Sequence, residues 1–166
     1  TISYTMNGGT NPSSNPSYYT CNDKITLAEP TRTGYTFLGW TYSGQTTPTK
    51  NVTIAVGTIG DKTYTANWQA NGYTVTLDAN GGKVSSSTLE VTYDASFTLP
   101  TPTRTGYTFD GWYNGSTKYT SGTWKITMNI TLTAKWTART DITYVVNHYQ
   151  QNANDDGYTL TSTENL

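Results

Sequence analysis

The sequence PTRTGYTFLGW, residues 30–40, occurs again as PTRTGYTFDGW at residues 102–112, with ten of the eleven positions identical. Agreement of this length does not arise by chance, so the chain is a tandem array. Units of about 70 residues bury only roughly 60% of the surface that their unfolded chain exposes, so each core is small. We predict two modules, residues 1–70 and 71–138, followed by a terminal segment, residues 139–166.

Around the repeated stretch, apolar and polar residues alternate with the period of two that is typical of half-buried strands. In module 1 the alternation begins with Ile2, Tyr4 and Met6 and ends at an Asn-Gly-Gly turn; module 2 repeats it over residues 73–79. No stretch of ten or more residues has helical spacing. We therefore predict mainly β modules, with at most one short helical turn each, in an elongated array.

The repeated stretch also has a mechanical interpretation. Trp112 is out of phase with Tyr107 and Phe109 on a regular strand, and Gly111 is the natural place for a bulge that turns the indole inward. An alternative is that Tyr107 and Trp112 form an exposed platform for a sugar. We favour a core role, because a module of this size needs its largest apolar groups inside. The predicted structural core set is Tyr35, Phe37, Trp40, Trp68, Tyr107, Phe109, Trp112 and Trp136.

The repeated stretch, the strand that ends in Asn-Gly-Gly and the closing Ala-x-Trp strand together resemble the Listeria–Bacteroides repeat, the internalin-type B repeat of bacterial surface proteins. The resemblance covers about residues 1–137. It implies a β-grasp-like module that is strung in arrays between a secreted N-terminal region and a cell-wall anchor. We therefore expect an extracellular location on a bacterial cell surface, attached to the wall in a longer protein. Module 1 departs from the pattern by four extra residues, which predicts a longer loop around residues 44–50.

The terminal segment is not a third copy. Ile142, Tyr144, Val146 and His148 alternate, residues 152–157 form a turn, and the chain then extends again, which predicts a β-hairpin. The string YVVNHYQQN resembles the opening of a mucin-binding-protein-type repeat. Because an isolated hairpin is marginally stable in water, it must pack on module 2, pair with another chain, or belong to a module cut short. Strand-swapped or edge-paired self-association through residues 140–166 is one of these possibilities.

Catalytic and cofactor motifs are absent from the sequence. His148 is the one histidine, and no Gly-x-Ser-x-Gly elbow accompanies it, so an outward-facing strand histidine is the better interpretation. Cys21 is the one cysteine, which excludes an intrachain disulfide, and it has no catalytic motif around it. Residues 152–157 fit the front half of a calcium loop, but a plain hairpin turn is favoured. We expect no enzyme activity, no cofactor and no metal.

Composition limits the partners. The chain carries 10 Lys and Arg against 11 Asp and Glu, a net charge of −1, so no basic field attracts nucleic acid. No apolar run is long enough for insertion into a membrane.

Two functions remain from the sequence. The first is a non-catalytic stalk of an adhesin-like surface protein, whose repeats contact neighbouring modules and project or present a binding domain. The second is that the repeats themselves bind a host glycan or matrix protein. The candidate contacts for such a ligand are Tyr42, Tyr113 and Tyr119, which are expected near loops and strand ends.

Overall fold

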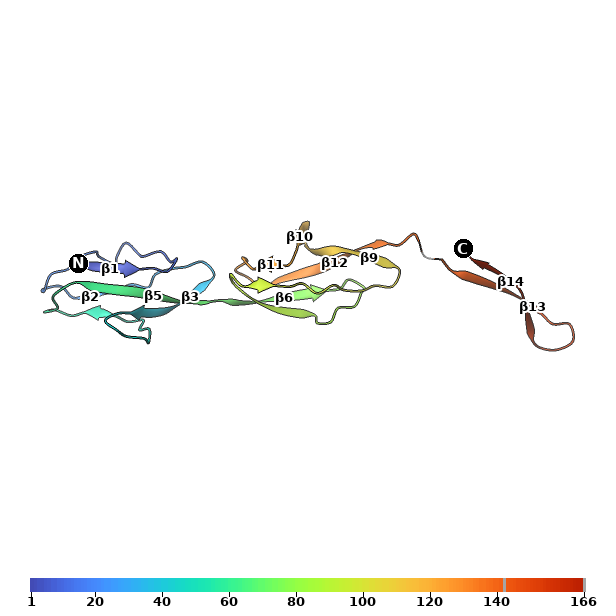
Figure 1. Cartoon of the computed structure of the whole chain (residues 1–166), viewed down its shortest axis with the longest axis horizontal. Coiled ribbons are helices and arrows are strands. Elements are labelled where there is room, and N and C mark those ends of the chain that lie inside the picture. Colours follow the sequence, from blue (N-terminus) through green and yellow to red (C-terminus); the bar gives the residue numbers. More distant parts are fainter. Residues whose placement is uncertain (142, 166) are drawn as a thin grey trace.

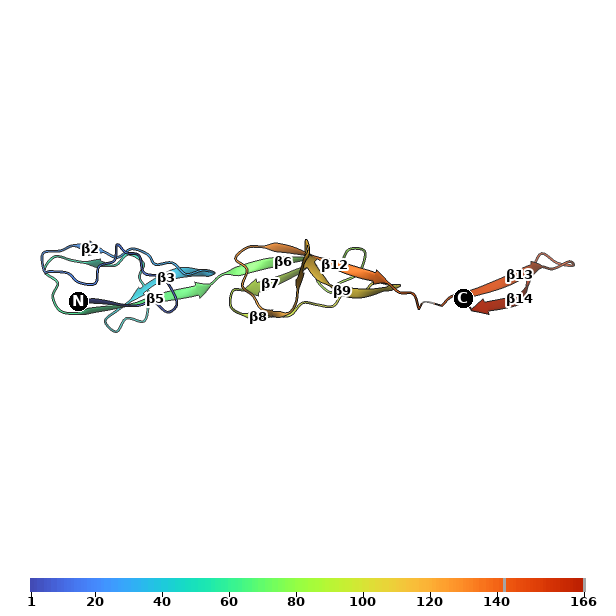
Figure 2. The ribbon, with the colours of Figure 1, turned by 90° about the horizontal axis from the view of Figure 1, so that it is seen from above.

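The computed structural model describes residues 1–141 and 143–165. Figure 1 shows three bodies that follow one another along the long axis of the molecule: module 1, module 2 and a terminal hairpin. The view at right angles, Figure 2, shows the same slender row. Every element within the described residues is a β-strand, which confirms the prediction of mainly β repeat modules. The β-grasp-like assignment that the resemblance implies stays a prediction.

Module 1 is built on a sheet in the order β1-β5-β3, in which β1 runs parallel and β3 antiparallel to the central β5. The strands β2 and β4 form a separate, short antiparallel pair. The strands are β1 Ile2–Thr5, β2 Ile25–Thr26, β3 Tyr35–Thr41, β4 Thr53–Ile54 and β5 Lys62–Ala70.

Module 2 repeats this plan with a larger sheet, in the order β10-β9-β12-β6-β7, and again its first and last strands, β6 and β12, run parallel. The pair β8 and β11 corresponds to β2 and β4. The strands are β6 Gly72–Asp78, β7 Thr88–Thr92, β8 Ser96–Phe97, β9 Tyr107–Asn114, β10 Thr117–Tyr119, β11 Gly122–Thr123 and β12 Ile130–Ala138.

The predicted bulge lies at the same place in both modules. In β3 the pairing with β5 skips Leu38, and in β9 the pairing with β12 skips Asp110. The glycine that follows each skipped residue has a positive φ, 136° at Gly39 and 143° at Gly111, which other residues rarely adopt. The next residue, Trp40 or Trp112, is thereby turned into the core, with 0% and 2% exposure respectively.

Each module has its own hydrophobic core. Trp40, Phe37 and Tyr64 lie in the first, and Trp112, Trp124 and Leu132 lie in the second. Of the predicted core set, Trp68 packs against the first core and Phe109 and Trp136 pack against the second, all partly buried. The structure places Tyr35 and Tyr107 outside both clusters, at the ends of the modules. We therefore assign these two tyrosines to the module tips, because they are the first residues of β3 and β9 and adjoin the turns rather than the sheet centre.

The closing tryptophans also fasten the Asn-Gly-Gly turns. The Trp68 indole N–H donates to the Met6 carbonyl at 2.9 Å, and Trp136 donates to the Ala79 carbonyl at 3.0 Å. The turn asparagines Asn7 and Asn80 donate to carbonyls of the last strand of their own module. The turns are thereby held against the central strands, and their positive φ angles suit Asn and Gly.

The terminal segment forms the predicted hairpin, from β13 (Val145–Gln151) and β14 (Tyr158–Asn165). Its first predicted position, Ile142, and the last residue of the chain, Leu166, lie outside the described residues. The hairpin stands apart from module 2 in Figure 1. Its apolar side chains are exposed, for example Tyr149 at 58% and Leu160 at 48%.

Within residues 1–141 and 143–165, no helix is long and apolar enough to cross a membrane.

Candidate functional site: the junction between the modules

One residue connects the two sheets. β5 ends at Ala70 and β6 begins at Gly72, so Asn71 alone lies between them. Its N–H donates to the Gly34 carbonyl at 2.9 Å, and its carbonyl accepts from the Tyr93 N–H at 2.9 Å. The Thr36 hydroxyl donates to the Asn71 side chain at 2.6 Å. The connecting residue is therefore hydrogen-bonded to both modules.

An aromatic contact closes the junction. Gly34 is buried and has a φ of 78°, and a Cβ added there would overlap the ring of Tyr93. The rings of Tyr35 and Tyr93 meet edge to face, with 5.7 Å between their centroids and 77° between their planes. This is a favoured geometry for aromatic pairs, because the positive edge of one ring faces the negative face of the other. The absence of a side chain at Gly34 is what lets the two modules approach.

A polar cluster surrounds this contact. The Tyr35 hydroxyl donates to Asp94 Oδ2 at 2.8 Å, and Lys125 donates to Asp94 Oδ1. The hydrogen bonds from Lys125 and from Tyr35 hold the pKa of Asp94 below its usual range. The same bonds raise the pKa of the Tyr35 hydroxyl and of the Lys125 ammonium. The carboxylate of module 2 thus joins a tyrosine of module 1 to a lysine of its own module.

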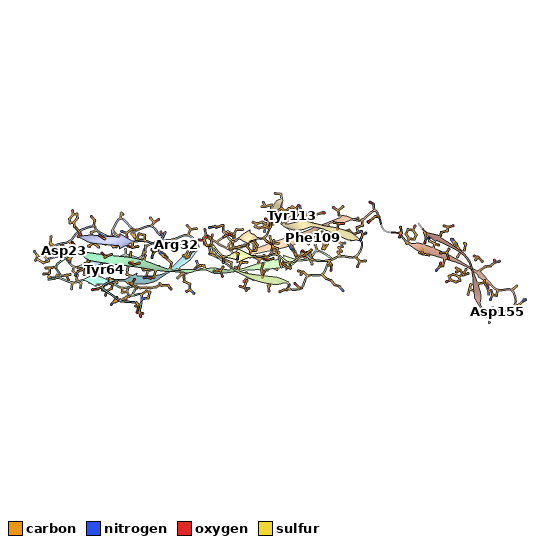
Figure 3. All side chains as sticks on the ribbon, in the orientation of Figure 1. Asp23, Arg32, Tyr64, Phe109, Tyr113 and Asp155 are labelled. Atoms are coloured by element: carbon orange, nitrogen blue, oxygen red, sulfur yellow. The ribbon has the colours of Figure 1, made fainter. Side chains whose placement is uncertain are left out.

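Arg32 completes the site from the module 1 side. Its guanidinium lies over the Tyr35 ring, with Cζ 3.6 Å from the centroid. Figure 3 shows Arg32 at the end of module 1 that faces module 2. Stacking of this kind favours the charged group electrostatically and fixes its plane.

The tip of module 2 has the same local structure as the tip of module 1. Arg104 lies over the Tyr107 ring at 3.9 Å, and the Arg139 N–H donates to the Gly106 carbonyl at 2.9 Å, as Asn71 does to Gly34. Its surroundings differ, because Tyr107 is 37% exposed and lies next to the hairpin connection instead of a following sheet.

The three tyrosines that the sequence offered as ligand contacts lie on separate surfaces. Tyr42 lines a groove of about 400 Å³ in module 1, where its ring is 5.2 Å from that of Tyr64. Tyr113 is on β9, between β10 and β12 in the module 2 sheet, and the Lys135 ammonium lies 4.0 Å from its ring centroid. Tyr119 packs against the module 2 core. The structure does not bring these residues into one site.

The residues whose types suggest metal binding or catalysis have other partners. In the turn of the hairpin, Asp155 Oδ1 accepts from the Asn152 side chain at 2.8 Å and from the Gly157 N–H at 2.7 Å. His148 is 48% exposed and lies 3.8 Å from a Glu164 oxygen. In the described part of the chain, no group of three or more His, Cys, Asp or Glu side chains could hold a metal ion.

Sequence reasoning missed the module 2 half of the junction, namely Tyr93, Asp94 and Lys125. One signal was available: Tyr93-Asp94 takes the place of Cys21-Asn22 when the modules are aligned on their repeated stretches. Tyr93 and Asp94 lie at the end of module 2 that faces module 1. The corresponding end of module 1 has neither a tyrosine nor a carboxylate at these positions, and this difference is consistent with a docking role.

Comparison with known proteins identifies the repeats. The Listeria-Bacteroides repeat domain family matches residues 1–67 and again residues 73–135. The comparisons give no support for a mucin-binding-type repeat in the terminal segment. No solved structure matches the chain significantly.

Among curated proteins, the chain is similar to internalin H of Listeria monocytogenes, with 40% identity over 114 residues, 65% of this chain and 20% of the relative. It is also similar to a protein of Evansella cellulosilytica named as a membrane protein, with 32% identity over 163 residues, 95% of this chain and 23% of that protein. The chain thus spans only about a fifth of the length of these relatives.

Proposed function

Since the chain belongs to the Listeria-Bacteroides repeat domain family and carries two copies in tandem, we propose that residues 1–138 are non-catalytic spacer repeats of a bacterial cell-surface protein. The likeness to internalin H supports a surface protein. In this role the modules hold a binding domain, present elsewhere in an adhesin-like protein, away from the cell wall that anchors it.

The junction is the observation that carries this proposal. A spacer must transmit direction as well as length, so its modules must not swivel freely. The single connecting residue, the buried Gly34–Tyr93 contact and the bond from Tyr35 to Asp94 all restrict such rotation. A flexible linker would instead leave both tips solvated.

Distance distributions test the proposal directly. Cys21 is exposed in module 1 and is the one native cysteine, so a Ser116→Cys variant provides a label pair that spans the junction. Spin labels at these two positions should give one narrow distance distribution by pulsed electron paramagnetic resonance. A second pair that spans the hairpin connection, Ser116→Cys with Ser162→Cys in a Cys21→Ser background, is the matched comparison and should be broader. A broad distribution for the first pair would contradict the spacer function.

A second candidate function is recognition of a host glycan or matrix protein by module 1. The groove beside Tyr42 and Tyr64 favours it, because the groove also carries Asp61, Lys62 and several hydroxyls that suit sugar hydroxyl groups. Binding of the chain to an array of glycans and matrix proteins should then be lost in Tyr42→Ala and kept in Tyr113→Ala. If neither variant loses binding, the groove is not the ligand site.

A further inference from the structure

A cleft of about 510 Å³ lies at the junction and is lined by both modules. Module 1 contributes Arg32, Tyr35 and the threonines at positions 10, 31 and 33, and module 2 contributes Tyr93, Asp94 and Lys125. Ligand sites are common at boundaries between domains, because two convex bodies form a concave surface where they meet.

Arg32 is fixed in this cleft without a polar partner among the described residues. Its guanidinium stacks on Tyr35, and a Cβ added at Gly8 would lie 3.4 Å from Arg32 Cζ, so the glycine leaves room for the group. Within residues 1–141 and 143–165, the Arg32 guanidinium takes part in no hydrogen bond or ion pair, and only the Arg32 backbone carbonyl is engaged, by the Tyr35 N–H at 3.1 Å. Stacking orients the plane of a guanidinium but leaves its N–H donors, which lie in that plane, available to a ligand.

Among the described residues that line the cleft, Asp94 alone carries a carboxylate, and both of its oxygens already accept hydrogen bonds. Asp94 accepts from Lys125 through one oxygen and from Tyr35 through the other. The positive charge of Lys125 balances Asp94, and the charge of Arg32 remains in excess. The cleft therefore carries a net positive charge in a chain whose overall charge is −1.

We propose that this cleft binds an oxyanion group carried on a sugar, with the guanidinium of Arg32 taking two of the anion's oxygens. Arginine suits this task because its fork of parallel N–H groups matches a carboxylate, sulfate or phosphate. Lys125 offers further donors from the opposite module, and the hydroxyls of Thr31 and Thr33 and the ring of Tyr93 suit the sugar itself. Because both modules line the cleft, the ligand would bridge them.

The second tip supplies an internal control. Arg104 also stacks on its tyrosine, but its Nη1 donates to the Asn80 carbonyl at 3.1 Å. Within the described residues no lysine of a following module faces it. The two modules thus carry equivalent arginines. Arg32 lies in a cleft lined by both modules, and Arg104 lies on a tip without such a cleft partner among the described residues.

The test is a titration of the ¹⁵N-labelled chain, followed by NMR, with glucuronate, glucose 6-sulfate and glucose 6-phosphate. Glucose and sodium chloride at equal ionic strength serve as references. We expect saturable shifts of the amides of Thr33, Tyr35 and Tyr93 with at least one charged sugar and none with glucose. The three anions distinguish carboxylate, sulfate and phosphate sources. Equal shifts with glucose, or no saturable shift with any of the charged sugars, would overturn the proposal.

Matched variants locate the site. Arg32→Gln should weaken binding about tenfold or more, since bonds to a charged group are lost, and Arg104→Gln should leave the affinity unchanged. Arg32→Lys keeps the charge but loses the fork, and should bind more weakly than the parent chain. The label pair at Cys21 and Ser116→Cys checks that each variant keeps its modules docked. Equal losses in Arg32→Gln and Arg104→Gln would mean nonspecific attraction and would contradict the assignment.

Discussion

The two module tips, around Tyr35 and around Tyr107, have the same sequence and the same local structure but different neighbours. In each, an arginine stacks on the tyrosine and a glycine of positive φ accepts a hydrogen bond from the residue after the last strand. At the first tip that residue leads directly into a sheet whose Tyr93 covers Gly34. At the second it leads into the connection to the hairpin, and Tyr107 stays exposed.

This difference teaches that the tip is a property of the repeat, whereas docking is a property of the module that follows. The tip presents a flat glycine surface and an aromatic hydroxyl. At the first tip, Tyr93 and Asp94 of module 2 contact the glycine and the hydroxyl. At the second tip, no described residue of the hairpin makes a hydrogen bond to module 2. Stiffness of an array then depends on each junction separately, as expected for a quasi-linear repeat protein.

The largest expected effect is the loss of stability of one module when its core tryptophan is removed. Trp40→Ala should destabilise module 1 by about 3–5 kcal/mol, because it removes a fully buried indole. Module 2 has its own core, so its amide NMR signals should remain those of a folded domain. In Trp112→Ala, module 2 should be destabilised and the signals of module 1 should remain. Loss of both sets of signals together in either variant would mean that the junction couples the modules far more strongly than its contacts indicate.

A smaller effect compares the two glycines. Gly34→Ala and Gly106→Ala both force alanine into a left-handed conformation, at about 1–2 kcal/mol each. At Gly34 the added Cβ would also overlap the ring of Tyr93, which belongs to the other module. We expect the distance distribution between Cys21 and Ser116→Cys to broaden in Gly34→Ala and to stay narrow in Gly106→Ala. Identical distributions in the two variants would show that docking does not depend on the close approach at Gly34.

Removal of one hydroxyl should have a milder effect. Tyr35→Phe deletes the donor to Asp94 and should weaken docking slightly, because a solvent-exposed hydrogen bond between the modules is lost. Tyr107→Phe changes the same atom on the exposed tip, where no described residue accepts from it, and should have no measurable effect. Denaturant unfolding of both variants gives the comparison, and a cost at Tyr107 equal to that at Tyr35 would argue against a specific role for Asp94.

The smallest effect concerns pH. The pKa of Asp94 is lowered in the docked state by Lys125 and Tyr35, so its contribution is complete above the ordinary aspartate pKa of about 3.9. As the pH falls from there through the lowered pKa, protonation removes it and docking weakens. The distance distribution should therefore broaden in acid, and the Asp94→Asn variant should be insensitive to pH over this range. Equal acid sensitivity in Asp94→Asn would assign the effect to other carboxylates.

Several features of the fold follow from local rules that can be read in one strand. Alternation at Tyr64, Ala66 and Trp68 predicts a half-buried strand, and β5 has that form. The phase break at Gly111 predicts a bulge that buries Trp112, and the register confirms it. The terminal hairpin follows from the turn at residues 152–157.

Other features could not be predicted, because they depend on residues far apart in the chain. Alternation cannot show that Tyr35 and Tyr107 lie at module ends, because it gives the face of a residue and not the position of its strand end in space. The cluster of Tyr35, Tyr93, Asp94 and Lys125 joins a strand start, a turn and a loop from two modules. The sequence predicts only that Tyr42, Tyr113 and Tyr119 lie near loops and strand ends, and the distances between them depend on the tertiary structure.

The sequence by itself determined that this protein is a tandem β-array of a known repeat family with small aromatic cores. Repetition and periodicity are local properties, and the physics of a strand and a bulge acts within a few residues. Only the tertiary structure decided how consecutive modules meet and which copy of an identical arginine faces a cleft. The physical reason is that docking depends on the residues that face each tip. The two tips have the same local sequence, so that sequence cannot show which of them has a module docked on it.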